Sequence, residues 1–584
     1  MAVENLITEH IDIWTSAVKT KSASGRGSNK KLELYGVKKL RELILELAVR
    51  GKLVPQDPND EPASVLLERI AAEKAKLVKE KIIRESKSLP VVSRKEQPFV
   101  LPKGWVWERL GNVGIGATGK TPSTKQPIFF EGSIPFIGPG QINQNGEILA
   151  PEKFLSCDGL LNSTEAIEGD ILMVCIGGSI GKTAIARQTV GFNQQINAIR
   201  ALQMPSAYLY TSLSTDSFLQ ELLKKATGSA TPIINRRKWE ELLVPIAPLD
   251  EQHRIVAKVD ELMALCDQLE QQTEASIEAH QVLVTTLLDT LTNSADANEL
   301  MQNWTRISEH FDTLFTTEES IDQLKQTILQ LAVMGKLVPQ DPNDEPAAKL
   351  LKRIAEEKAQ LVKEKKIKKQ KALPPISEDE KPFELPNGWV WERLGNYSYV
   401  FAGNAFKSGD FNNEAGTKVI KITNAGVYSF IETNDFLPSE FSEAYYQYQV
   451  LEGDLILALT RPYISSGLKV SVCPSNYNKS LLNQRVAAIR TLDSTGFTFL
   501  FLQSPVVLSH YQQRFGGSGL QPNLKMSDVT DLFMAVPPKN EQLNIVRKVH
   551  ELFALCDQLR LRLRGSQKTQ LELTNTIVEQ AVES

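Results

Sequence analysis

The string most suggestive of chemistry is Gly114-Ile-Gly-Ala-Thr-Gly119-Lys120-Thr121, which fits the pattern of a phosphate-binding loop. Such a loop needs a hydrophobic strand before it and a helix after it, because backbone N–H groups and the helix N-terminus hold the phosphate. Here Pro122 follows at once, and the residues as far as Pro127 are not typical of a helix. The string therefore predicts a loop of another kind, and a nucleotide site remains only an alternative.

A second string, Phe136-Ile-Gly138-Pro-Gly140, matches a glycine motif of many S-adenosylmethionine-dependent methyltransferases. A methyltransferase acting on an amino group also needs an Asn/Asp-Pro-Pro-aromatic tetrapeptide, and the Pro-Pro pairs here stand in Leu-Pro-Pro-Ile and Val-Pro-Pro-Lys. No paired-carboxylate nuclease signature or nucleophile elbow is present, and no Cys/His cluster has metal-ligand spacing. The sequence thus predicts a chain without catalytic residues, without a metal site and without a bound cofactor.

Composition limits the kind of nucleic-acid binding that the chain could perform. The net charge is −4, and the segment 114–247 holds 11 basic and 11 acidic residues, against 10 and 11 in 398–537. DNA binding would therefore depend on a few Lys and Arg side chains at specific positions and on contacts to base edges. Five scattered cysteines favour a reducing cytoplasm, and no apolar run reaches the roughly 18 residues of a membrane span.

Polar loops punctuated by glycine carry the remaining candidates. Lys, Arg, Asn and Gln can bind base edges, while Ser, Thr and backbone N–H groups bind phosphate. Any one such residue is more commonly an ordinary solvated side chain, but as a set in two equivalent segments they predict a DNA-binding surface. The candidates are Lys120, Thr121, Gln141, Asn143, Ser179, Lys182, Gln194, Gln195, Arg236 and Arg237 in one segment, and Lys407, Lys421, Asn424, Arg461, Tyr463, Ser465, Asn483, Gln484, Arg485 and Lys525 in the other.

The elements that must position these residues are repeated along the chain. Residues 38–112 align without a gap to 322–396, with 51 of 75 positions identical, and the segment from Gly51 to Ala63 recurs letter for letter from Gly335 to Ala347. A second block, 249–273, aligns to 539–563 with 14 of 25 identical. The segments between the blocks have diverged. We call the duplicated blocks the frame. Because the frame is repeated and the segments between its blocks differ, the chain is expected to present two different recognition surfaces.

Local patterns predict the type of each element. The frame reads as helix, Gly51 cap, turn-rich connector and a second helix beginning near Ser64. Trp105 and Trp107 alternate as in a strand and are expected in the core. The variable segments combine short apolar strands with one helical stretch each, near 208–226 and 498–515. The strands are expected at 134–137, 171–176 and 196–202, and at 418–422, 455–459 and 486–489.

A heptad helix follows each variable segment, with apolar residues spaced alternately by four and three. Its seam is Ile255, Val259, Leu262, Cys266, Leu269 and Thr273 in the first copy, and Ile545, Val549, Leu552, Cys556, Leu559 and Leu563 in the second. This narrow stripe is typical of coiled-coil packing, and the two helices are the natural partners of each other. We expect an α+β protein with two globular α/β domains in a pseudo-twofold repeat, joined by two long helices that form an antiparallel coiled coil.

In this order, the motifs resemble those of specificity subunits of type I restriction–modification enzymes, in the branch with a long N-terminal constant region. The resemblance covers nearly the whole chain. It rests on the string from Leu101 to Trp105, Gly119-Lys-Thr-Pro-Ser123, Ile134-Pro-Phe-Ile137, the pair Glu168-Gly-Asp-Ile-Leu172 and Glu452-Gly-Asp-Leu-Ile456, and the strings 244–252 and 536–542. The second variable segment departs from the family pattern, with Gly403-Asn-Ala-Phe-Lys407 in place of Gly-Lys-Thr-Pro-Ser.

The resemblance implies a non-catalytic subunit that reads a bipartite double-stranded DNA target. It implies two methylation subunits that use S-adenosylmethionine to methylate adenine, and two restriction subunits that use ATP and magnesium to cleave. The expected division is an N-terminal helical constant region at 1–100, target-recognition domains at 101–248 and 385–538, a central constant region at 249–384 and a C-terminal coiled-coil helix at 539–584. A nucleotide- or methyl-donor-using DNA enzyme and a pure coiled-coil scaffold are the alternatives.

Overall fold

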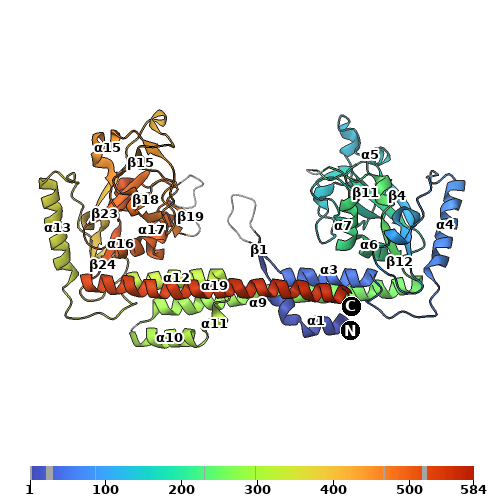
Figure 1. Cartoon of the computed structure of the whole chain (residues 1–584), viewed down its shortest axis with the longest axis horizontal. Coiled ribbons are helices and arrows are strands. Elements are labelled where there is room, and N and C mark those ends of the chain that lie inside the picture. The colour runs from blue at the N-terminus through green and yellow to red at the C-terminus, as the bar shows by residue number, and fades with distance from the viewer. Residues whose placement is uncertain are drawn as a thin grey trace. The chain divides into compact units, whose positions relative to one another are not determined.

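The computed structural model describes residues 3–21, 31–85, 87–228, 231–295, 297–464, 467–515 and 522–583 (Figure 1). The chain divides into two compact units, residues 1–275 with 567–584 and residues 276–566. Each unit contains one variable domain, and we describe each unit by itself.

The first variable domain is built on two four-stranded sheets and a two-stranded ribbon. The central sheet is antiparallel, and its strand β8 is buried along its whole length. The second sheet contains one parallel pair, β5 with β10. In sheet order the strands are β4 (Gly114–Thr118), β11 (Ile196–Ala201), β8 (Ile171–Val174) and β9 (Thr183–Ile185); β6 (Lys153–Leu155), β5 (Ile134–Ile137), β10 (Val190–Phe192) and β7 (Glu165–Ala166); then β12 (Leu243–Ile246) with β3 (Val106–Arg109).

The second variable domain repeats this topology strand for strand, although its sequence has diverged. A short ribbon of β19 (Tyr463–Ile464) and β20 (Gly467–Leu468) is added to it. In the same sheet order its strands are β14 (Ser398–Ala402), β23 (Val486–Thr491), β18 (Leu455–Ala458) and β21 (Val470–Val472); β16 (Phe436–Leu437), β15 (Thr417–Ile420), β22 (Ser480–Leu482) and β17 (Gln449–Val450); then β24 (Phe533–Val536) with β13 (Val390–Arg393). The predicted strands are therefore present in both domains.

Each expected helical stretch is two helices rather than one, which corrects the prediction. In the first domain α6 (Ser206–Leu213) ends before Thr215, whose hydroxyl caps α7 (Asp216–Lys225) by accepting from the N–H of Phe218. In the second domain α16 (Thr495–Gln503) ends before α17 (Pro505–Phe515), because a proline at the first helical position has no N–H to continue the preceding helix.

The frame helices begin and end close to where the sequence predicts. They are α3 (Tyr35–Val49) and α4 (Ala63–Lys79) in the first unit, α12 (Glu318–Val333) and α13 (Ala347–Lys363) in the second, and the two long helices α9 (Leu249–Asn293) and α19 (Lys539–Glu583). Gly51 and Gly335 end α3 and α12 with φ of 67° and 70°. A Cβ on Gly51 would lie 2.5 Å from Pro102 Cγ, so both the backbone conformation and the space require glycine.

The heptad seam faces inward, as predicted. Ile255, Leu262 and Cys266 are at most 1% exposed, and Ile545 and Val549 are fully buried. Within each unit the beginning of one long helix lies with the end of the other, which is the antiparallel arrangement (Figure 1).

A third helix joins each pair of long helices, so a two-helix coil is an incomplete description. In the first unit Arg41 of α3 pairs with Asp267 and Glu270 of α9, each at 2.7 Å. In the second unit Lys325 of α12 pairs with Asp557 of α19 at 2.6 Å. Within the described ranges, none of the helices combines the length and apolar composition that a membrane crossing requires.

Candidate nucleic-acid interface

Four loops of the first variable domain meet at one edge of its sheets. Backbone hydrogen bonds tie them together: Lys120 N to Phe192 O at 2.9 Å, Asn193 N to Ile137 O at 3.0 Å, and Cys175 N to Gln195 O at 2.8 Å. We call residues 119–121, 138–141, 175–182 and 193–195 the first rim.

The second variable domain has an equivalent edge, which we call the second rim: residues 403–407, 420–421, 459–461 and 483–485. The same bonds recur at matching positions, with Asn404 N donating to Leu482 O at 2.9 Å and Asn483 N to Ile420 O at 2.9 Å. Leu459 N donates to Arg485 O, also at 2.9 Å. Two diverged sequences therefore build the same surface scaffold.

Glycine is required where each rim begins. A Cβ on Gly119 would lie 1.9 Å from Asn193 O, and one on Gly403 would lie 2.0 Å from Asn483 O. This close approach explains the glycine of the string that resembles a phosphate-binding loop. Its earlier residues, Gly114–Thr118, form strand β4, and a loop rather than a helix follows. The two rims therefore share a structural glycine, and the string is part of a sheet.

The Glu-Gly-Asp motifs stabilise the central sheets below the rims. Asp170 accepts from the guanidinium of Arg200 on β11 at 2.8 Å through both oxygens, and Asp454 accepts from Arg490 on β23 at 2.7–3.2 Å. Hydrogen bonding to Asp170 raises the pKa of Arg200 above its usual value. These buried carboxylates are structural rather than catalytic.

Seven of the candidates predicted from the sequence lie together on the first rim. Lys120 and Gln194 are exposed, and the Thr121 hydroxyl donates to Gln194 Oε1 at 2.7 Å. Gln195 Oε1 accepts from Asn193 Nδ2 at 3.2 Å. The others are Gln141, Ser179 and Lys182, all half-buried.

The second rim gathers Lys407, Asn483, Gln484, Arg461 and Arg485, of which the last two occupy left-handed backbone positions with φ of 50° and 68°. Tyr463 lies on β19, two residues beyond Arg461, and Lys525 precedes α18 (Met526–Thr530). Ser465 lies outside the described residues.

The comparisons with known proteins agree with this geometry. A family model described as "Type I restriction modification DNA specificity domain" matches residues 102–279 and 403–563, the two variable domains with the beginnings of the helices that follow. The chain belongs to this specificity-subunit family.

Two Escherichia coli relatives match the whole chain over their own whole lengths. They are the specificity subunits of the type I restriction enzymes EcoAI, 44% identical, and EcoEI, 43% identical. A solved structure from work on complex assembly and conformational transition of the type I R-M system covers 83% of the chain and 99% of its own, with a TM-score of 0.50 and 18% identity. That likeness supports the fold described above.

Two candidates from the second domain serve the fold instead of a surface. Asn424 is fully buried; its amide donates to Ile431 O at 2.7 Å and its oxygen accepts from Lys421 N at 2.7 Å. Lys421 is half-buried in an ion pair with Asp435 at 2.5 Å. The prediction of a DNA contact is wrong for Asn424, because its amide has no route to solvent, and Lys421 would first have to leave its carboxylate.

Three candidates from the first domain also make hydrogen bonds or ion pairs within the protein. Arg237 donates to the carbonyls of Lys87 and Ser88, both at 2.9 Å, and to Glu241 at 3.0 Å. These bonds use all three nitrogens of its guanidinium and fasten the connector to the domain, so Arg237 is a structural residue. Arg236 pairs with Glu240 at 3.3 Å, and the Asn143 side chain closes its own turn by accepting from Asn145 N and Glu147 N.

One rim residue was missed by sequence reasoning. Asn193 accepts from Gln195 N and donates to that side chain, at the position that Asn483 occupies in the second rim. Aligning the strings Asn193-Gln-Gln195 and Asn483-Gln-Arg485 would have identified it. The alignment also pairs Gln195 with Arg485, so the two rims differ at an equivalent position.

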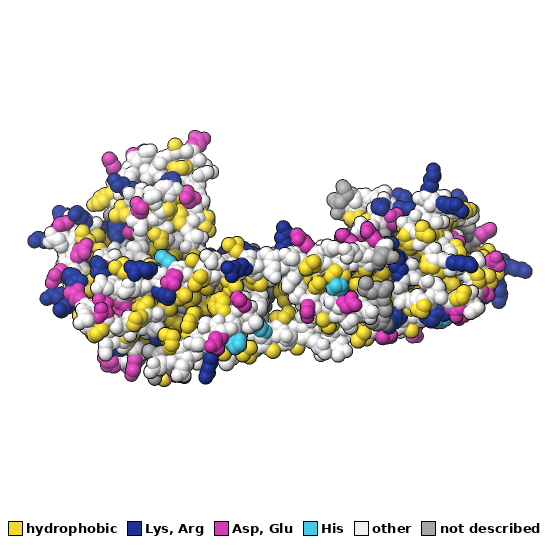
Figure 2. All heavy atoms as spheres, turned by 60° about the horizontal axis from the view of Figure 1, so that its bottom comes forward, with side chains coloured by type: hydrophobic (Ala, Val, Ile, Leu, Met, Phe, Trp, Pro, Cys, Tyr) yellow, Lys and Arg dark blue, Asp and Glu magenta, His cyan; other side chains and the backbone are white. Residues whose placement is uncertain are grey.

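Two buried cysteines of the variable domains are held in the thiol form. Burial raises the pKa of Cys175 and Cys473 to about 12, which keeps these thiols protonated. No group of three His, Cys, Asp or Glu in the described ranges could hold a metal ion. On the face shown in Figure 2, basic and acidic side chains are interspersed and form no single patch.

Proposed function

We propose that each variable domain of this specificity subunit reads one half of a bipartite double-stranded DNA sequence through its rim. The observation that carries the proposal is the pair of rims: the same loop scaffold presents different polar side chains in the two domains. A scaffold that is kept while its displayed residues change is suited to reading two different sequences.

The side chains on the rims favour different bases. Gln194 and Gln195 on the first rim can bind adenine through its N6 and N7 atoms, whereas Arg461 and Arg485 on the second can bind guanine through O6 and N7. Lys120 and Lys407 are both exposed, and we expect them to contact phosphate. We expect an adenine in the half-site read by the first domain and a guanine in the other.

The chain itself is proposed to be non-catalytic and to act in the cytoplasm. Two methylation subunits that use S-adenosylmethionine would methylate adenine within the target. Two restriction subunits that use ATP and magnesium would cleave the DNA. Two observations support the proposal that the partner subunits carry out the catalysis. The string Gly114–Thr121 has a structural role, and burial keeps the Cys175 thiol protonated.

Mapping methylated adenines in the DNA of cells that carry this chain with its partner subunits tests the proposal. We expect a single motif made of two short defined parts separated by an unread spacer. A continuous motif, or methylation without sequence preference, would contradict it. Purified chain that binds ATP or S-adenosylmethionine would favour the enzyme alternative, and purified complex that retains no specific duplex would favour the scaffold.

A further inference from the structure

A run of lysines ends helix α13 and continues beyond it in the second unit. Residues 363–371 contain six lysines and one acid, Glu364, so their net charge is +5. We call this run the lysine segment. Blocks of like charge repel one another, and basic blocks commonly bind an oppositely charged partner such as nucleic acid. The six lysines, all exposed, are Lys363, Lys365, Lys366, Lys368, Lys369 and Lys371.

Most of this charge is not neutralised by the protein. Within the described part of the chain, Lys366 is the only one of the six in an ion pair, with Glu364 at 2.8 Å. The corresponding residues of the first copy, 79–87, contain four cations and two acids, a net charge of +2. Ile82 and Glu85 stand there in place of Lys366 and Lys369. The repeated frame therefore folds without the extra positive charge, which belongs to the second copy.

The lysine segment is fastened to the second variable domain. Ile367, at its centre, is 8% exposed and belongs to the core cluster that contains Tyr399 and Phe401 of β14. Three residues further on, Gln370 Nε2 donates to Val400 O at 2.6 Å. The lysines therefore project from a backbone that is held against β14, and they do not belong to a free tail.

Strand β14 leads from the lysine segment to the second rim. From Tyr399 to Gly403, where the rim begins, the chain advances four residues, which is about 13 Å in a strand. Aromatic rings connect the same two places, because Lys368 Nζ lies 6.0 Å from the centre of the Tyr448 ring and Tyr448 packs against the cluster of Phe406 on the rim. The separation corresponds to about four base pairs, at 3.4 Å per pair.

The second domain has no excess of positive charge of its own, since residues 398–537 hold 10 basic and 11 acidic residues. The lysine segment supplies cations from just outside this range. Helix α13 lies at the end of the unit where α19 begins, and Asn540 of α19 donates to Asp344, close to the start of α13, at 2.8 Å (Figure 1). Both long helices continue into the other unit from residues 276 and 566. DNA beside the lysine segment is therefore expected to be the flank of the target and not its spacer.

We infer that the lysine segment binds the phosphate backbone of double-stranded DNA just outside the half-site read by the second domain. A lysine ammonium is a compact charge on a flexible stem, and its contacts to phosphate raise affinity without reading bases. Because the first copy has the lower charge, this contact holds one flank of the target more firmly than the other. The inference rests on the proposed function.

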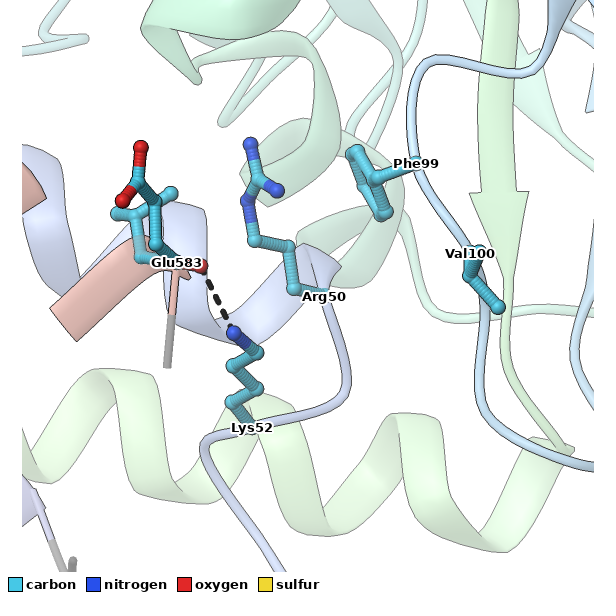
Figure 3. A pocket seen from close by; sticks show the side chains of 6 residues that line it. Arg50, Lys52, Phe99, Val100 and Glu583 are labelled. Atoms are coloured by element: carbon cyan, nitrogen blue, oxygen red, sulfur yellow. Dashed lines mark hydrogen bonds between the residues drawn. The ribbon is translucent and has the colours of Figure 1, made fainter. Parts of the chain in front are cut away.

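A pocket of the first unit also contains two cations but is a weaker candidate. It is lined by Arg50, Lys52, Phe99, Val100, Val582 and Glu583 (Figure 3). Arg50 lies over the Phe99 ring, 4.2 Å from its centre, and Lys52 Nζ donates to Val582 O at 2.7 Å. Both cations therefore already have partners in the protein, and the pocket offers DNA no comparable group of lysines.

The test uses the full-length chain assembled with its methylation subunits. The glutamine variant combines Lys365→Gln, Lys366→Gln, Lys368→Gln, Lys369→Gln and Lys371→Gln, and the arginine variant carries Lys→Arg at the same five positions as the charge-preserving control. Ile82→Lys with Glu85→Lys adds the missing charge to the exposed first copy. Fluorescence anisotropy gives Kd and its salt dependence on two duplexes that contain the mapped target. The long duplex extends about 15 base pairs past the second half-site, and the short duplex ends about two base pairs past it, before the lysine segment is reached.

On the long duplex we expect the Kd of the glutamine variant to rise by about tenfold or more, with the slope of log Kd against log salt falling by about one for each lost phosphate contact. The arginine variant should bind like the wild type. On the short duplex the wild type and the glutamine variant should bind alike. Ile82→Lys with Glu85→Lys should tighten binding to a duplex extended past the first half-site.

Equal Kd values for the wild type and the glutamine variant on the long duplex would overturn the inference, as would an equal loss on both duplexes. Native mass spectrometry of each variant counts the bound subunits. Loss of a subunit from the glutamine variant, with no dependence of Kd on duplex length, would show that the lysine segment binds a protein and would also overturn the inference. A wild-type complex that does not prefer the target duplex would instead contradict the proposed function.

Discussion

Arg461 holds a backbone position that the fold alone would give to glycine. Its φ is 50°, and the equivalent residue of the first domain is Gly177, with φ of 96°. Both residues donate their N–H to a proline carbonyl at 2.9 Å, Pro522 and Pro232. A left-handed conformation costs a residue with a side chain about 1–2 kcal/mol. The Arg461 side chain is exposed and, among the described residues, has no ion-pair partner, so the fold gains nothing visible from it.

Replacing Arg461 with glycine is expected to separate stability from DNA binding. Relief of the backbone conformation gains about 1 kcal/mol, and the greater freedom of glycine in the unfolded chain costs about 0.5–1 kcal/mol, so folding stability should change little. If the guanidinium binds guanine through two hydrogen bonds, its loss costs about 1–3 kcal/mol. That energy corresponds to roughly a 5- to 150-fold rise in Kd.

The assay is fluorescence anisotropy of the assembled methylation complex on its mapped duplex, paired with urea denaturation of the specificity chain. Arg490→Gln is the comparison variant. It breaks the ion pair with Asp454, whose side chain is buried at 3% exposure, and it is expected to lower folding stability. Unchanged Kd for Arg461→Gly would refute base reading by this residue. A stability loss above about 2 kcal/mol would show that the side chain supports the fold.

Three further results are expected. Glu251→Ala should cost about 1–3 kcal/mol in urea denaturation, because it leaves the buried indole N–H of Trp105 without its 2.9 Å acceptor. Glu251→Gln should cost less, because its one amide oxygen can still accept from Trp105, although its NH2 group cannot accept from Gln56. Burial raises the pKa of Glu251, although the hydrogen bonds from Trp105 and Gln56 oppose this. The native state therefore binds the proton more tightly than the unfolded state, and folding stability falls as pH rises through that pKa. When stability is measured from pH 4 to 8, this decrease should be absent in Glu251→Gln. Each long helix contains residues of both units. Inserting seven residues after Ser276 of α9 and after Ser566 of α19 should therefore lengthen the unread spacer by about three base pairs, at 1.5 Å per residue and 3.4 Å per pair. An unchanged spacer would show that the helices do not set its length.

Sequence patterns predicted the parts of the fold that depend on local physics. The caps at Gly51 and Gly335 follow from a backbone conformation that glycine favours, and the inward seam follows from the heptad spacing. The helix breaks at Thr215 and Pro505 were local signals as well, but they lay inside stretches of helical residues and were overlooked. The packing of a third helix beside each coil depends on contacts between segments far apart in the chain, which no local pattern contains.

The repeat also extends further than the aligned blocks. Ile7-Thr8-Glu9-His10 corresponds to Ile307-Ser308-Glu309-His310, and both histidines precede a short helix, α2 (Ile11–Ser16) and α11 (Phe311–Leu314), with nearly the same φ. The four-residue match is too short to detect by alignment, and only the matching backbone identifies it.

The candidate site was predictable in kind and only partly in its residues. Loop position and residue type identified Gln194, Gln195, Arg461 and Arg485, which lie on the rims. The same criteria selected Asn424, which is buried, because polarity and a neighbouring glycine describe a structural turn as well as a binding loop. Tertiary packing decides between the two, and the sequence does not encode it locally.

Replacing residues 113–248 with the matching segment of a relative that reads a different sequence tests the central claim most directly. Adenine methylation mapped in cells that carry the hybrid and its partner subunits should show one half of the target changed and the other half, with the spacer, retained. A change in both halves, or in neither, would contradict the claim that each domain reads its own half-site.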